Sequence, residues 1–170
     1  MKRFLYPLYL LIIVVVLIPK DKLYFTLESY LAENHIYLNN ETFSNALVYF
    51  DAENIDVLMD AQKIATIGNV RISAWIFLNR FTLNDISFSP LYRNFFPGTV
   101  ERIVMSYSLL NPLEISIDGE GDFGHCEGNI DWIDQKIRIV FEATPQLRRY
   151  PLLVNKLYQS KEGLVYESSY

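Results

Sequence analysis

The chain has 170 residues, of which 15 are basic, 20 are acidic and 51% are hydrophobic. This acidity argues against a nucleic-acid surface, which needs a basic stripe to displace counterions, and against a polybasic surface for lipid headgroups. The single cysteine, Cys126, rules out an internal disulfide. We expect it to be a small, half-buried hydrophobic residue rather than a reactive thiol.

The first 19 residues predict a membrane anchor. Lys2 and Arg3 precede residues 4–18, which carry no charge and consist of Phe, Leu, Ile, Val, two tyrosines and one proline. A secretory signal peptide begins in the same way, but no small-x-small cleavage site follows at Ile18. The segment is short for a spanning helix. We expect an uncleaved signal anchor; the alternatives are a cleaved signal peptide and a buried core helix.

The anchor divides the chain into two parts. Residues 1–19 are the cytoplasmic start and the transmembrane anchor, and residues 20–170 form one β-rich domain. Positive charge at Lys2, Arg3 and the amino terminus, against Lys20 and Lys22, predicts a cytoplasmic N-terminus. We therefore expect a single-pass protein of a bacterial inner membrane with its bulk in the periplasm. Without Lys2 and Arg3, 13 basic residues face 20 acidic ones, a net charge of −7.

Residues 21–34 predict an amphipathic helix, because Leu23, Leu27 and Leu31 share one stripe with two tyrosines. Its polar face is not basic, so we expect it to pack on a sheet edge rather than on the membrane surface. Short strands are then predicted at residues 46–50, 55–59, 63–67, 70–79 and 81–88. Gly68-Asn69 is predicted to be a two-residue hairpin turn, and residues 89–98 a looser connection.

The second half alternates apolar and polar residues with period two, which predicts antiparallel strands with one covered and one wet face. Glu114, Asp118, Asp131 and Arg138 are expected on the wet side. The covered set either lines an apolar groove or forms the core of a closed sandwich. Its members are Leu113, Ile115, Ile117, Ile130, Trp132, Ile137, Ile139 and Phe141.

A helical stretch is predicted at residues 145–160, with Pro151 forcing a kink or a restart. The predicted fold class is therefore mainly β. It comprises a single N-terminal transmembrane helix, a short amphipathic helix, a curved antiparallel sheet, folded over or in a sandwich, and a C-terminal helix.

Residues 119–124 match G-x-G-x-x-G, the dinucleotide fingerprint, but a strand follows where the motif needs a helix. Asp118, Glu120 and Asp122 would also repel phosphate. These acids suggest calcium instead, yet the distal glutamate and flanking helices of an EF-hand are missing. We expect glycines that serve backbone bends in a curved sheet, namely Gly119, Gly121, Gly124 and Gly128.

No catalytic constellation is recognisable. His35 and His125 lack the cysteine pairs of a structural zinc site. His125 and Cys126 are adjacent on a predicted strand, so they point to opposite faces and cannot form a nucleophile pair. There is no G-x-S-x-G elbow. We expect no enzyme activity, no cofactor and no metal.

One passage resembles a known family. A strand enters Gly119-x-Gly121, then Gly124-x-x-x-Gly128, and a strand with Ile130-Asp-x-Ile follows. This passage looks like the last part of type II secretion system protein N, a family similar in turn to AsmA-like proteins. The motif covers about residues 113–166, and the layout of anchor and β-rich domain covers the whole chain. The resemblance implies an inner-membrane accessory of envelope transport, with a curved sheet whose concave face is apolar and no catalytic residues.

Two functions are expected from this sequence. The first is a non-enzymatic envelope protein that assists secretion or the transfer of lipid or other hydrophobic cargo. The second is a membrane-tethered module that binds an envelope partner by strand addition. The expected partners are the membrane, lipid and other envelope or secretion-system proteins, with no nucleic acid.

Overall fold

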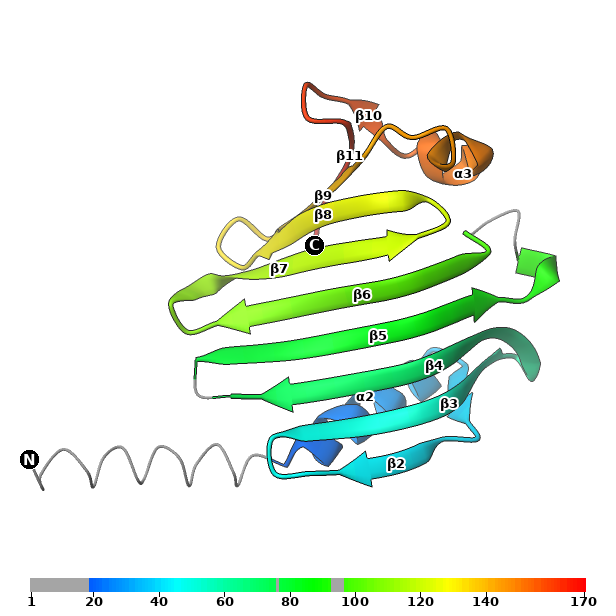
Figure 1. Cartoon of the computed structure of the whole chain (residues 1–170), viewed down its shortest axis with the longest axis vertical. Helices are drawn as coiled ribbons and strands as arrows, with labels where there is room; N and C mark the ends of the chain where they lie inside the picture. Colours follow the sequence, from blue (N-terminus) through cyan, green and yellow to red (C-terminus); the bar gives the residue numbers. More distant parts are fainter. Residues whose placement is uncertain (1–18, 76, 93–96) are drawn as a thin grey trace, which may run out of the picture.

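The structure is a computed structural model that describes residues 19–75, 77–92 and 97–170. It is mainly β, with one large antiparallel sheet and few helices (Figure 1). The sheet has 11 strands in the order β1-β3-β4-β5-β6-β7-β8-β9-β11-β10, and β2 pairs with β3 beside β1. From β3 to β9 the strands follow one another in sequence, so the sheet is a meander with local connections.

The elements follow one another along the chain as α2 (Lys20–Glu33), β1 (Ile36–Asn39), β2 (Thr42–Asn45), β3 (Tyr49–Met59), β4 (Gln62–Ala74), β5 (Leu78–Phe88), the 3₁₀ turn η1 (Pro90–Tyr92), β6 (Thr99–Ser108), β7 (Asn111–Gly121), β8 (Gly124–Asp131), β9 (Lys136–Phe141), the 3₁₀ turn η2 (Leu147–Arg149), α3 (Pro151–Val154), β10 (Tyr158–Gln159) and β11 (Leu164–Ser169).

The mainly β, antiparallel fold class is confirmed, and the predicted helix at 21–34 agrees with α2 to within one residue at each end. The C-terminal helix is shorter than predicted. Residues 145–160 contain η2, the single-turn α3 and the short strand β10 (Tyr158–Gln159). Pro151 begins α3, at a position where the missing N–H of proline is not needed.

The predicted transmembrane segment, residues 4–18, lies outside the described residues. Within the described part of the chain, no helix combines the length and the hydropathy needed to cross a membrane.

The strands of the first half have other bounds than predicted, and the hairpin turn predicted at Gly68-Asn69 is wrong. Both residues lie inside β4, and the predicted strands at 46–50 and 55–59 belong largely to one strand, β3. The predicted strand at 70–79 runs from the end of β4 into the start of β5, and β6 lies at residues 99–108, where no strand is predicted. At each predicted break, two polar or glycine residues stand between two apolar residues of the core face, and the strand continues through them. Ile67 and Val70 flank Gly68-Asn69 in this way, and Val70 is buried in the core while Ile67 is packed against it.

A pair of this kind occurs in each of the four neighbouring strands β3 to β6, and the pairs are aligned across the sheet. One row of partners joins Ala52, Val70, Leu83 and Ile103, and the next joins Ile55, Ile67, Ile86 and Val100. All eight are in the core or packed against it. Between the two rows, Asn54 and Asp85 adopt φ values of 58° and 55°. Asn and Asp tolerate this left-handed conformation better than most residues, so the strands bend and keep their apolar side chains on one face.

The sheet therefore has an apolar face and a mostly polar face. A representative row of cross-strand partners on the apolar face is Phe50, Ile72, Phe81, Met105, Ile117, Gly128, Ile139 and Tyr166. The neighbouring row on the polar face is Asp51, Arg71, Thr82, Val104, Asp118, Glu127, Val140 and Val165.

Two separate elements cover the two ends of the apolar face. In Figure 1, α2 lies behind β3 and β4, where Tyr24 is buried against the rings of Phe43 and Phe50. At the other end, the segment around η2 and α3 covers a second core cluster, in which Leu147 is fully buried beside Phe123 and Phe141. The strands between these two covers keep part of their apolar face open.

Candidate functional site: an apolar groove beside α2

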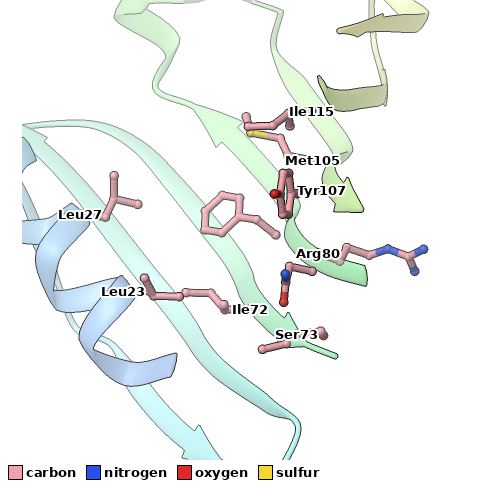
Figure 2. Close-up of a pocket in the computed structure, with 11 residues that line it drawn as sticks. Leu23, Leu27, Ile72, Ser73, Arg80, Met105, Tyr107 and Ile115 are labelled. Atoms are coloured by element: carbon pink, nitrogen blue, oxygen red, sulfur yellow. The ribbon is translucent and has the colours of Figure 1, made fainter. Parts of the chain in front are cut away.

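An open cavity of about 430 Å³ lies between α2 and strands β4–β7 (Figure 2). Its volume falls within the range of small-molecule sites, roughly 300–1,000 Å³. The residues that line it, which we call the groove, are Leu23, Leu27, Ile72, Ser73, Ala74, Asn79, Arg80, Phe81, Met105, Tyr107 and Ile115.

The groove exists because α2 is narrower than the sheet that it covers. Tyr24 anchors the helix over β3, while Leu23 and Leu27 stay exposed on the side of the helix that faces β5. Figure 2 shows these two leucines on one wall and Met105, Tyr107 and Ile115 on the strands of the other. The apolar face of β5, β6 and β7 therefore continues beyond the edge of α2 with no element over it among the described residues.

The lining suits an apolar ligand. Among the groove residues only Arg80 and Tyr107 carry an ionisable group. Figure 2 shows the guanidinium group of Arg80 extending away from the cavity, on the far side of its strand. The described residues of the groove therefore present an almost entirely uncharged, mainly apolar lining.

A second hollow of about 350 Å³ adjoins the groove and shares two of its residues. It is lined by Tyr107, Pro112, Ile115 and Trp132. Because Tyr107 and Ile115 border both cavities, the apolar surface extends from α2 across the ends of β6 and β7 toward the β8–β9 turn.

The eight residues predicted to line a groove have different environments. Ile115 lines the groove itself, and Ile115 and Trp132 line the adjoining hollow. Phe141 is buried in the core cluster beneath Leu147. Leu113 and Trp132 are exposed, whereas the remaining four are partly buried on the apolar face: Ile117, Ile130, Ile137 and Ile139.

Sequence reasoning missed most of the groove. The helical period places Leu23 and Leu27 on one stripe, but the stripe does not indicate which strands it faces. Ile103, Met105 and Tyr107 stand at every second position with polar Arg102 and Ser106 among them, a period-two signal that predicts a strand, although the apolar Val104 weakens it.

The glycines of β7 and β8 lie where neighbouring chain segments come close. A Cβ atom at Gly121 would lie 2.8 Å from the carbonyl oxygen of Thr99 and 3.0 Å from the ring of Phe123. Gly124 has a φ of 98°, which favours glycine at the turn into β8. Because β8 starts at Gly124, no helix N-terminus follows the G-x-G-x-x-G sequence to receive a phosphate.

The polar face carries a cluster of charged groups on β6, β7 and β8. Nε2 of His125 lies 3.2 Å from Oε1 of Glu127 and 3.9 Å from Oδ2 of Asp118. The hydrogen bond with Glu127, assisted by the charges of Asp118, Glu127 and Glu142, raises the pKa of His125 above its ordinary value. Nη2 of Arg102 lies 3.7 Å from Oδ1 of Asp118 and 3.4 Å from Oε2 of Glu120.

Three residues of this cluster are a poor metal site, although one possible ligand atom from each lies within 4.8 Å of the others. They are Asp118, His125 and Glu127. Nδ1 of His125 is buried without a hydrogen-bond partner, whereas a metal-bound histidine normally donates its second N–H to an acceptor. Arg102 competes for Asp118. The carboxylate of Asp122, considered for calcium, instead accepts a hydrogen bond from the backbone N–H of Thr99 at 2.8 Å.

Cys126 is buried on the opposite side of β8 from His125, next to Phe123 and Phe141. Burial raises the pKa of its thiol to about 11, with smaller contributions from Asp118 and Glu127. Cys126 is therefore more deeply buried than the half-buried position that the sequence predicts, and the raised pKa disfavours the reactive thiolate.

Comparison of the chain with protein-family models, curated proteins and solved structures gives no significant match. Function is therefore inferred from the groove, the two sheet faces and the sequence pattern.

Proposed function

We propose that this chain is a non-enzymatic, membrane-anchored protein of the bacterial envelope that holds lipid or another hydrophobic cargo in the groove. The observation that carries the proposal is an open apolar cavity of about 430 Å³ with leucines of α2 on one side and half-buried sheet residues on the other. An acyl chain in this cavity would remove apolar surface from water on both walls, at about 25 cal/mol per Å².

Supporting evidence for the membrane setting comes from the start of α2. The helix begins at Lys20, directly after the segment predicted to be the anchor, and Leu23 and Leu27 follow within its first two turns. A groove so close to an anchor would open near the bilayer from which a lipid could enter. The resemblance to type II secretion system protein N and to AsmA-like proteins is the reason why secretion and lipid transfer are the proposed processes.

The test is to measure lipid that stays with the purified full-length chain. The protein is extracted in mild detergent, and bound lipid is quantified by mass spectrometry. Leu27→Asp places a carboxylate in the groove at a position that is 37% exposed in the free protein. We expect the bound lipid to fall by roughly tenfold or more, equivalent to about 1.4 kcal/mol.

Tyr30→Asp is the matched control, because Tyr30 lies on the same helix, is 64% exposed and does not line the cavity. It should retain the lipid of the unmodified chain. Equal lipid in the Leu27→Asp and Tyr30→Asp variants, or no lipid in the unmodified chain, would contradict the proposal.

A second candidate, partner binding by strand addition, has one observation in its favour. β11 pairs with β9 along Leu164–Ser169, but its other edge pairs with β10 only at Leu164 and Val165. Within the described residues no strand covers the edge at residues 166–169. A free edge of this kind is a template for an added strand.

A further inference from the structure

Four hairpin turns lie together at one end of the sheet, on the left in Figure 1. They join β2 to β3, β4 to β5, β6 to β7 and β8 to β9, and each one exposes large apolar side chains. We call these side chains the apolar end: Leu47, Trp75, Phe77, Leu78, Leu109, Leu110, Trp132 and Ile133.

The turns at the opposite end differ, as far as the described residues extend. The β3–β4 turn is Asp60-Ala61, and the β7–β8 turn is Asp122-Phe123, whose phenylalanine is buried in the core. Leu91 in η1 is an exposed apolar residue there. Among the described residues, the exposed apolar side chains of the turns are therefore concentrated at one end of the sheet, with Leu91 as the exception at the other.

Both tryptophans of the chain belong to the apolar end. Trp75 is 57% exposed and Trp132 is 58% exposed, and they lie in different turns. A tryptophan ring has an apolar body and a polar N–H, which is why this residue concentrates at the interface between water and lipid. Exposed apolar side chains gathered on one part of a protein mark a contact with a partner or a membrane.

The chain also enters the sheet at this end. Lys20 donates a hydrogen bond from Nζ to the carbonyl oxygen of Leu47, at 2.8 Å. The start of α2 is thus tied to the β2–β3 turn, and the 18 residues before Pro19, with their apolar run at 4–18, join the described structure beside the apolar end.

We infer that the apolar end inserts into the surface of a phospholipid bilayer, with the tryptophans at the boundary between headgroups and acyl chains. The groove opens close by, because Ala74 at the end of β4 and Asn79 in β5 both line it. Insertion would therefore place the groove against the lipid that it is proposed to bind. The inference itself depends on the turns and stands even if the groove holds no cargo.

The test uses the full chain in phosphatidylcholine vesicles and reads the fluorescence of each tryptophan separately. Trp75→Phe leaves Trp132 as the reporter, and Trp132→Phe leaves Trp75. In both variants we expect emission to fall when the lipid carries bromine on its acyl chains near the headgroup. We also expect protection from iodide in the water.

The matched control moves the reporter to the other end of the sheet. Leu91→Trp, in a chain with Trp75→Phe and Trp132→Phe, places a tryptophan where Leu91 is 76% exposed. This reporter should be quenched by iodide and not by brominated lipid. A second variant, Leu110→Asp, changes a side chain that is 86% exposed, so it should weaken lipid quenching of both native tryptophans without disturbing the fold.

The inference is overturned if Trp75 and Trp132 respond like the reporter at position 91, or if the chain does not float with the vesicles. Lipid binding in the groove can be tested separately from insertion of the apolar end, because Leu27→Asp should reduce the bound lipid and leave the quenching of both tryptophans unchanged.

Discussion

The lack of a Cβ atom at Gly121 in β7 allows β6 and the β7–β8 turn to pack closely against it. A Cβ atom there would lie 2.8 Å from the carbonyl oxygen of Thr99 and 2.9 Å from Cα of Val100. Because both are backbone atoms of the adjacent chain segment, they cannot move aside independently. We expect Gly121→Ala to lower the free energy of unfolding by about 1–3 kcal/mol, measured by denaturant unfolding.

Gly98→Ala serves as the control for this substitution. Its Cβ would meet only Oδ2 of Asp122, at 3.1 Å, so this side-chain oxygen has to shift by a few tenths of an ångström while it keeps its hydrogen bond from the N–H of Thr99. We expect a loss below about 1 kcal/mol. Similar losses for Gly98→Ala and Gly121→Ala would show that close packing is not the role of Gly121.

His125 gives the polar face a pH dependence of known sign. Its hydrogen bond to Glu127, with the charges of Asp118, Glu127 and Glu142, raises its pKa in the folded protein above 6.5. The protonated ring therefore stabilises the fold below about pH 6.5, and this contribution is lost as the pH rises through the raised pKa.

We expect the unmodified chain to lose more stability than His125→Gln between about pH 6 and pH 8. Thermal unfolding followed by circular dichroism at each pH measures the difference. Parallel curves for the two proteins would mean that the His125–Glu127 pair contributes nothing to stability.

Among the elements, the bent strands β3 to β6 show what a single sequence can and cannot predict. The sequence pattern predicts strands in the regions of β3, β4 and β5, although with other bounds, and it predicts none at β6. Gly68-Asn69 has the composition of a hairpin turn, and only its alignment with Asn54 and Asp85 on neighbouring strands makes it a bend instead. That alignment is a long-range property, so no local pattern contains it.

The bend itself can be tested with a residue that favours strands. Valine suits an extended strand, but its β-branched side chain is strained at the positive φ of Asn54. We expect Asn54→Val to destabilise the fold by about 1–3 kcal/mol.

Glu53→Val, one residue earlier, is the control, since Glu53 is exposed on the same strand and has no positive φ. Its free energy of unfolding should change by less than about 0.5 kcal/mol. A stable Asn54→Val variant would mean that the left-handed bend is not required.

For the whole molecule, the sequence predicts an apolar sheet face but not the location of its opening. The alternation at residues 113–141 identifies side chains of that face, and Phe141 is buried while Ile115 lines the groove. The part of the apolar sheet face that stays open depends on where α2 and the segment around η2 and α3 pack on the sheet. Those positions follow from packing at Tyr24 and Leu147, which the periodicity of a helix or strand does not encode.

The central claim is that the groove holds lipid, and a photo-cross-linking amino acid at position 27 tests it most directly. With benzoylphenylalanine in place of Leu27, irradiation of cells followed by intact-mass measurement of the purified chain should give an adduct with the mass of a membrane lipid. The same substitution of Tyr30, on the same helix outside the groove, should give much less. Absence of a lipid adduct at position 27, or an adduct with another protein instead, would contradict the account.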